Sequence, residues 1–79
     1  MKEYICGFSD HRGIHYCGYV EQRETMRDLG LNALAFVTES DTVPGCVVYP
    51  LWEWVSDREE AVKLVKNWIS KKKEALHME

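Results

Sequence analysis

The chain has 79 residues, a formal net charge of −3 and 46% hydrophobic residues, values that are ordinary for one globular domain. The acidic balance excludes a generally basic nucleic-acid-binding protein, although it is compatible with a local basic patch. No hydrophobic run approaches the roughly 20 residues of a membrane span, and the first residues lack the pattern of a signal peptide. We therefore expect one cytoplasmic domain over residues 1–79, with no membrane partner.

The first predicted unit is a β-hairpin with strands at residues 3–9 and 14–21, which are rich in aromatic and β-branched residues. Asp10 and Gly13 frame a connection that suits a type I turn followed by a left-handed glycine. The resulting pairs are Tyr4–Val20, Cys6–Gly18 and Phe8–Tyr16. One face is then apolar and the other mixed, as expected for a sheet that is covered on one side. The apolar face carries Tyr4, Cys6, Phe8, Ile14, Tyr16, Gly18 and Val20.

The chain has three cysteines, an odd number that is typical of a reduced intracellular protein. In the register above, Cys6 and Cys17 point to opposite faces of the hairpin and cannot form a disulfide. We expect all three cysteines to be free, and Cys17 to react faster than Cys6 and Cys46, because Cys17 lies on the mixed face.

The middle of the chain has a less distinct pattern. Residues 22–31 are good helix formers, and Gly30 is placed to end such a helix. Residues 32–38 fit one face of a helix and also one face of a strand, and we favour a short helix followed by a third strand. Pro44 and Gly45 suit the centre of a type II turn.

A fourth strand is predicted at residues 46–49, and Pro50 either ends it or marks it as an edge strand. Residues 51–55 continue as strand or lead into the last helix. Ser56 and Glu59 have the spacing of a capping box, with Ser56 as N-cap. The apolar side of the helix that follows carries Ala61, Val62, Leu64, Val65, Trp68, Ile69, Ala75 and Leu76.

Trp68 is expected to be the central core residue, because it is the largest side chain on the apolar side of this helix. Lys72 interrupts the same side, which predicts that the buried part ends near residues 69–70 and that the tail frays. The predicted fold is α+β, in the order strand-strand-helix-strand-strand-helix. A four-stranded antiparallel sheet is covered on one face by the C-terminal helix.

The chemistry-bearing residues do not form a catalytic pattern. His11, His15 and Cys17 are ligand types that zinc accepts, but no second pair of ligands completes the set. The carboxylates are scattered, no glycine-rich phosphate loop is present, and a chain this short has little room for a pocket. We expect no enzyme, metal or cofactor, with a small zinc module as one alternative.

Protein binding is the favoured function. Trp52 and Trp54 flank Glu53, and in an extended segment both indoles point the same way. With acidic neighbours they would form an aromatic patch that has a charged rim. The predicted partner-binding residues are Trp52, Glu53, Trp54, Glu59 and Glu60. The competing interpretation is that both tryptophans pack under the helix as core.

Nucleic-acid or nucleotide binding is the other alternative. Residues 61–79 carry five lysines against two glutamates. The candidate phosphate contacts are Lys63, Lys66, Lys71, Lys72 and Lys73, assisted by aromatic residues of the hairpin. The ordinary explanation for these lysines is a solvated helix end whose charge suits the helix dipole.

Two short segments resemble a known family. Val43-Pro44-Gly45-Cys46, followed by Ser56-Asp57-Arg58-Glu59-Glu60-Ala61, is similar to two pieces of HicB-type antitoxins, which pair a small sheet and helix with a toxin. The segments comprise ten of the 79 residues and lie farther apart than in that family. The sequence as a whole predicts a small regulatory protein of inhibitor or antitoxin type, as mobile elements encode, acting as a monomer or homodimer.

Overall fold

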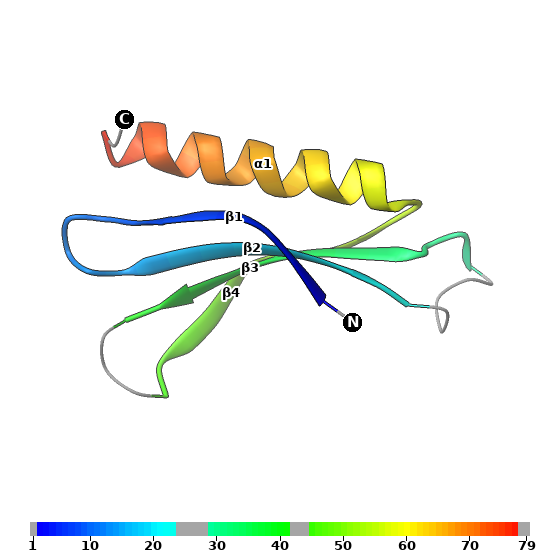
Figure 1. The fold of residues 1–79 in the computed structure, drawn as a ribbon, viewed down its shortest axis with the longest axis horizontal. Coiled ribbons are helices and arrows are strands. Elements are labelled where there is room, and N and C mark those ends of the chain that lie inside the picture. Colours follow the sequence, from blue (N-terminus) through cyan, green and yellow to red (C-terminus); the bar gives the residue numbers. More distant parts are fainter. Residues whose placement is uncertain (1, 24–28, 42–44, 78–79) are drawn as a thin grey trace.

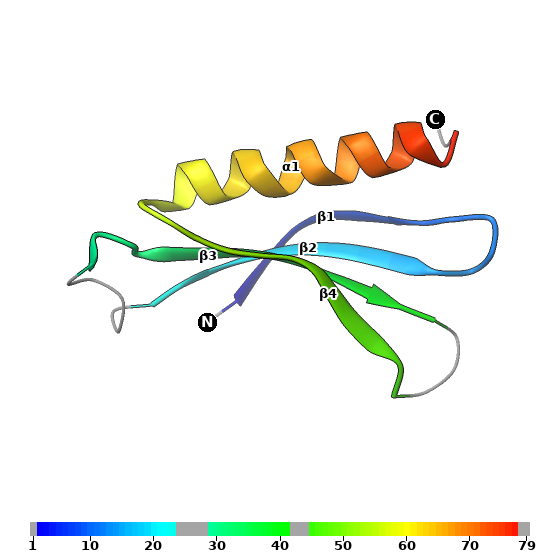
Figure 2. The ribbon, with the colours of Figure 1, turned by 180° about the vertical axis from the view of Figure 1, so that it is seen from behind.

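The computed structural model describes residues 2–23, 29–41 and 45–77. It contains the strands β1 (Lys2–Ser9), β2 (His15–Gln22), β3 (Ala33–Ser40) and β4 (Val47–Val55), followed by the helix α1 (Arg58–Ala75). The strands form one antiparallel sheet in the order β1-β2-β3-β4, and α1 covers one of its faces (Figures 1 and 2). The predicted α+β fold is confirmed. Of residues 22–31, expected to form a helix, residues 24–28 lie outside the described ranges, Gln22 belongs to β2, and Gly30, the predicted helix end, has a φ of 70°.

The β1–β2 hairpin has the predicted turn and, next to it, the predicted register. Gly13 has a φ of 85°, and Phe8 pairs with Tyr16. A bulge between Tyr4 and Cys6 then shifts the register, so that Tyr4 pairs with Tyr19 instead of Val20. The predicted placement of Tyr4 on the covered face is therefore wrong, because an extra residue in one strand reverses the alternation of its side chains.

β3 is the strand that the sequence pattern left ambiguous. Its residues Ala33, Leu34, Ala35, Phe36 and Val37 are all buried. A central strand that is buried on both faces has a continuous apolar run instead of an alternating one, and such a run also fits a helix. Residues 33–40 are entirely extended.

β4 is an edge strand that continues through Pro50 to Val55. The register between β3 and β4 shifts between Val37 and Glu39, where β4 has one additional residue, because Tyr49 and Pro50 together lie opposite Thr38. A bulge at an edge is a position where the missing N–H of proline costs little. Pro50 therefore marks an edge strand, which is one of the two outcomes that the sequence allowed. The predicted turn at Pro44 and Gly45 involves residues outside the described ranges.

α1 begins one residue later than predicted. The N-cap is Asp57, whose Oδ1 accepts a hydrogen bond from the Glu60 N–H at 2.9 Å. The Ser56 hydroxyl instead hydrogen-bonds the Glu60 carboxylate at 2.6 Å. The capping pair is therefore Asp57 and Glu60, not Ser56 and Glu59.

The C-terminal part of α1 remains on the sheet. The last buried residue of the helix is Ile69, so the predicted end of its buried part near residues 69–70 is confirmed. The predicted fraying of the tail is wrong, because the helix continues to Ala75 and the partly buried Leu76 still packs against the core. The Lys72 ammonium lies 5.5 Å from the ring centroid of Tyr16 and 5.9 Å from that of Trp68. A lysine is tolerated on the apolar side because its stem packs on the rings while its charged end interacts with their faces.

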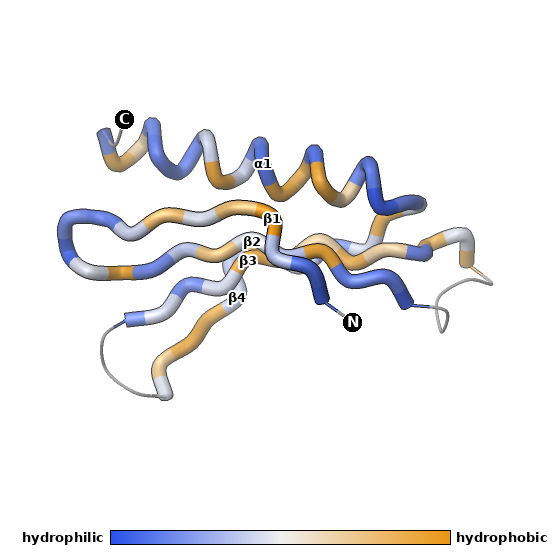
Figure 3. Tube along the Cα trace, in the orientation of Figure 1, coloured by the Kyte–Doolittle hydropathy of each residue, from blue (hydrophilic) through white to orange (hydrophobic). Residues whose placement is uncertain are grey.

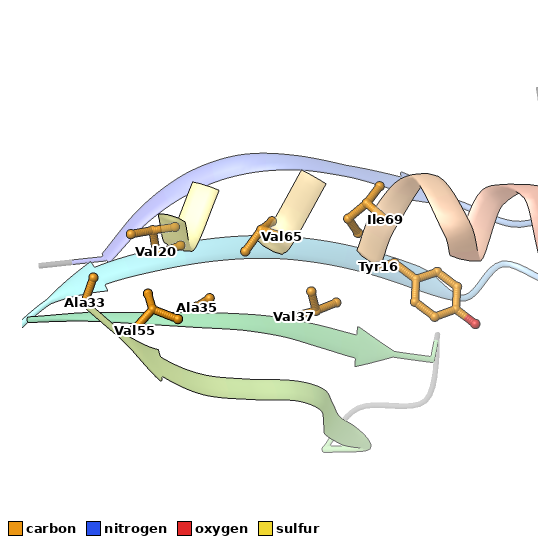
Figure 4. Close-up of a cluster of buried hydrophobic side chains, with 9 residues drawn as sticks. Tyr16, Val20, Ala33, Ala35, Val37, Val55, Val65 and Ile69 are labelled. Carbon is orange, nitrogen blue, oxygen red and sulfur yellow. The ribbon is translucent and has the colours of Figure 1, made fainter. Parts of the chain in front are cut away.

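The core lies between α1 and the covered face of the sheet (Figure 4). The apolar residues of α1 lie on its sheet-facing side (Figure 3). Its buried residues are Ala61, Val65 and Ile69. Trp68 is only half-buried and packs at the rim against Tyr16, with ring centroids 6.2 Å apart. The prediction of Trp68 as the central core residue is wrong, because the close approach of α1 to the sheet leaves room only for smaller side chains at the centre.

The three cysteines are free thiols. Cys6 packs against the core, Cys17 is half-buried, and Cys46 is exposed. The expectation that Cys46 is shielded is therefore wrong, because Cys46 precedes β4 and lies outside the sheet.

Candidate binding surface on the open face of the sheet

The face of the sheet opposite α1 carries aromatic side chains on all four strands. Alternation along β2 and β3 directs Val20, Ala35 and Val37 towards α1, so Tyr19 and Phe36 point to the open face. Tyr4 pairs with Tyr19, and Phe36 pairs with Trp52. Together these side chains form what we call the aromatic row, which consists of Tyr4, Tyr19, Phe36, Tyr49 and Trp52.

The rings of the aromatic row touch in sequence across the sheet. Tyr4 meets Tyr19 edge-on at a centroid distance of 5.9 Å, and Tyr19 stacks on Phe36 at 5.3 Å. Trp52 lies 5.4 Å from Phe36 and meets Tyr49 edge-on at 5.4 Å. These are the distances and arrangements that aromatic pairs favour. The row is therefore a contiguous surface and not a set of isolated rings.

The aromatic row has a buried centre and exposed ends. Phe36 is only 5% exposed, whereas Tyr4, Tyr49 and Trp52 are 57%, 54% and 52% exposed. Neighbouring rings hold each exposed side chain against the sheet, so little conformational entropy is lost when a partner covers it. Contiguous exposed apolar surface of this kind marks interaction sites.

The phenol group of Tyr19, in the middle of the row, is held in its neutral form. Burial raises the pKa of Tyr19 above its ordinary value, and the neighbouring Cys17 and Tyr4 act in the same direction. The Lys2 ammonium lies 4.8 Å from the centroid of the Tyr19 ring. The row therefore offers apolar rings with polar hydroxyl groups, and the Lys2 ammonium lies at its β1 end.

The two edges of the sheet are poorly suited to adding a further strand. β1 is interrupted by the bulge between Tyr4 and Cys6, and β4 has Pro50 at its own bulge. Bulges and prolines are the features by which edge strands avoid pairing with another chain. Docking on side chains of the open face is the arrangement that this sheet favours.

The predicted partner-binding residues are divided between the two sides of the molecule. Trp52 belongs to the aromatic row, and Trp54 pairs with the buried Leu34 on the same face, so neither tryptophan packs under α1. Glu53 pairs with Ala35 and therefore lies on the side of α1. The exposed acids Glu59 and Glu60 lie in the first turn of α1. The structure thus places the two tryptophans on one face but does not place the three acids around them.

The lysines of the nucleic-acid alternative also lie on the side of the helix. All five belong to α1, and none forms an ion pair with an acid within residues 2–23, 29–41 and 45–77. The Lys73 ammonium lies 5.8 Å from the centroid of the Phe8 ring. These lysines are Lys63, Lys66, Lys71, Lys72 and Lys73. They are separated from the aromatic row by the thickness of the sheet.

The residues of the zinc alternative do not converge. His15 Nδ1 lies 2.5 Å from the hydroxyl oxygen of Ser9 in a hydrogen bond, and His11 is exposed in the turn. Among the described residues, no group of three or more His, Cys, Asp or Glu side chains is arranged to hold a metal ion. No helix in the same part of the chain is long and apolar enough to cross a membrane.

Sequence reasoning identified Trp52 but missed the rest of the row as one surface. Tyr4 and Tyr19 were assigned to opposite faces, and Phe36 lay in the ambiguous segment. The feature of the sequence that could have indicated one surface is the presence of an aromatic residue in each of the four strands. Comparisons of the chain with models of protein families, with curated proteins and with solved structures found no match.

Proposed function

We propose that this protein is a non-enzymatic binding domain that docks a protein partner on its aromatic row. The observation that carries the proposal is the set of three exposed aromatic side chains on the uncovered face, of which Tyr49 and Trp52 pack on the buried Phe36 and Tyr4 is joined to it through Tyr19. Tyrosine and tryptophan are enriched among the residues that dominate binding energy in protein interfaces. Trp52, which touches both Phe36 and Tyr49, is the main anchor of the surface.

The charge distribution favours a protein over a single-stranded nucleic acid. Proteins that stack bases on aromatic side chains place cations beside them to track the phosphates. Among the described residues, the cation in ring contact with the aromatic row is Lys2, whereas the unpaired lysines lie on α1. The net charge of −3 opposes long-range attraction of a polyanion.

The mode of action that follows is occupation of a partner surface. The sheet supplies a platform whose side chains are held before binding, which lowers the entropic cost of association. Such a domain regulates its partner by covering a functional surface, as an inhibitor or antitoxin does. The protein itself then needs no catalytic group.

The decisive experiment begins with affinity capture of proteins from the source cells by the full chain. The partner recovered is then purified, and its affinity is measured calorimetrically with the wild type and with Trp52→Ala, Tyr49→Ala and Val48→Ala. Val48→Ala is the matched control, because Val48 is an exposed apolar residue on β4 that pairs with Glu39 on the helix side.

We expect Trp52→Ala to weaken binding by roughly 30-fold or more, the loss that corresponds to truncating a hot-spot residue. Val48→Ala should leave the affinity within about threefold, the range of an energetically neutral contact. Equal binding by wild type and Trp52→Ala would overturn the proposal. A nucleic-acid partner would also overturn the proposal. In that case nuclease treatment would abolish the capture, and the protein would bind an oligothymidylate probe through the lysines of α1.

A further inference from the structure

A second surface lies along one flank of α1, away from the aromatic row. It is a groove of about 360 Å³ lined by Leu64, Asn67, Trp68, Lys71, Lys72 and Ala75. All of these residues belong to the helix. β4 diverges from α1 towards its Val47 end in both ribbon views, so the strand does not cover this part of the helix (Figures 1 and 2).

The spacing of the lining residues is that of a helix-packing surface. Leu64, Asn67, Trp68 and Lys71 stand at positions i, i+3, i+4 and i+7, the four residues that form a hole for a side chain of a neighbouring helix. A second hole with the same spacing is formed by Trp68, Lys71, Lys72 and Ala75. Two successive holes fit two side chains that are one helical turn apart on another helix.

The charges along this flank define what fits the second hole. Lys71 and Lys72 line it, and neither forms an ion pair with an acid in the described parts of the chain. The first hole is lined on its apolar side by Leu64 and Trp68, and Asn67 and Lys71 complete it. The groove therefore fits a helix that presents an apolar side chain and, one turn away, a carboxylate.

α1 itself has this pattern on the same flank. Glu60 precedes Leu64 by one helical turn, and its side chain is exposed. Glu60 and Lys71 are equally distant along the helix from the midpoint between Leu64 and Asn67. In an antiparallel pair of α1 helices related by a two-fold axis at that midpoint, each Glu60 lies opposite a Lys71, and each Leu64 lies opposite an Asn67.

We propose that a second copy of this chain occupies the groove, forming a two-fold dimer through antiparallel α1 helices. Leu64 of each copy enters the hole between Leu64 and Lys71 of the other. Glu60 of each copy reaches the hole that Lys71 and Lys72 line. The interface is isologous, so every favourable contact occurs twice.

The contact is small, because it uses one flank of a single helix of 18 residues. Interfaces below about 1,200 Å² belong to weak, transient complexes, so we expect a dissociation constant in the micromolar range that rises with salt. The aromatic row lies on the other side of the sheet and stays open in this dimer. The proposal is therefore independent of the proposed function, although the dimer would present two binding faces.

Charge reversal tests the pairing directly. Sedimentation velocity at low ionic strength, across the micromolar to millimolar range, is performed on the full chain and on Glu60→Lys and Lys71→Glu. We expect the wild type to dimerise and each single variant to be monomeric, because each homodimer would contain two like-charge pairs. An equimolar mixture of the two variants restores opposite charges at both pairs and should dimerise again.

Two controls separate this outcome from simpler effects. Lys66→Glu makes the same charge change on the opposite flank of α1, beside Cys6, and should leave the dimerisation constant within threefold. Circular dichroism verifies that the variants are folded, and restoration by mixing cannot result from misfolding. A monomeric wild type, or a mixture that stays monomeric, overturns the proposal. A dimer that persists in both charge variants and disappears in Trp52→Ala also overturns it, since the second copy would then occupy the aromatic row.

Discussion

Val65 of α1 packs directly on the Cα atom of Gly18 in β2. A β-carbon at position 18 would overlap the Cγ1 methyl group of Val65, and it would lie 3.7 Å from Cγ1 of Ile69. Glycine is unfavourable inside a strand, so its presence in the second strand of the sheet has a packing reason. The absence of a side chain lets the helix approach the sheet at this point and places Val65 at 0% exposure.

Gly18→Ala should therefore destabilise the protein by about 1–3 kcal/mol, the usual cost of overpacking a core. In a protein that already carries Val65→Ala, the methyl group that would collide is absent. There Gly18→Ala should lower the free energy of unfolding by at least about 1 kcal/mol less than it does in the wild type. Urea unfolding of the wild type, both single variants and the double variant, followed by circular dichroism, measures this coupling. Additive effects of the two changes would show that α1 does not pack on Gly18.

Ile69→Ala should destabilise the protein more than Trp68→Ala, although tryptophan is the larger residue. Ile69 is 5% exposed and lies in the core cluster, so its truncation should cost about 2–5 kcal/mol. Trp68 is half-buried at the rim, where water can fill the space left by its side chain. The free energies of unfolding in urea give the order, and a larger loss for Trp68→Ala would place that tryptophan in the centre after all.

Thiol modification should proceed in the order Cys46, Cys17, Cys6. Cys46 is exposed, whereas the other two side chains are half-buried. Burial raises the pKa of the Cys6 thiol, and the positive charges of Lys66 and Lys73 offset this increase only in part. A smaller fraction of Cys6 is therefore present as the reactive thiolate. Limited alkylation of the native protein, with peptide mass spectrometry, measures the three rates. Modification of Cys6 before Cys46 would contradict the described packing of β1 on α1.

Because of Asp10, the stability of the hairpin should fall at acid pH. Its side chain has no exposed surface, and burial works to raise its pKa. Hydrogen bonds from the Arg12 side chain and from the backbone N–H groups of Ile14 and Arg12 outweigh that effect, so the pKa lies below its ordinary value. A carboxylate with a lowered pKa in the folded state stabilises the fold above its unfolded pKa, and the contribution is lost as the pH falls below about 4.

Asp10→Asn tests this contribution. The amide oxygen can still accept the two backbone hydrogen bonds now made to Oδ1, whereas the ion pair between Oδ2 and Arg12 is lost. The variant should be less stable than the wild type at pH 7, and the difference should shrink as the pH falls. The pKa of Glu3 is also lowered, mainly by its hydrogen bond from Arg58. The contribution of Glu3 to the free energy of unfolding is the same in the wild type and the variant, so it cancels when the two proteins are compared. A difference that is independent of pH would contradict the ionised state of Asp10.

The sequence by itself determined the elements whose signals are local. Asp10 and Gly13 specify a turn through their own backbone preferences, and this turn sets the pairing of Phe8 with Tyr16. The spacing of Ala61, Val65 and Ile69 specifies a helix that is apolar on one side, and such a side must be covered. An α+β sheet covered by a C-terminal helix follows from these local patterns.

Only the tertiary structure decided which residues share a face. The bulges in β1 and β4 place Tyr4 beside Tyr19 and Tyr49 beside Trp52, and each bulge exists only relative to the strand with which it pairs. The strand at Ala33–Ser40 is recognisable only once both of its faces are covered by neighbours distant in the chain. A shift of one residue reverses the direction of every later side chain. The composition of the aromatic row is therefore a property of the assembled sheet and could not be read from any one of its strands.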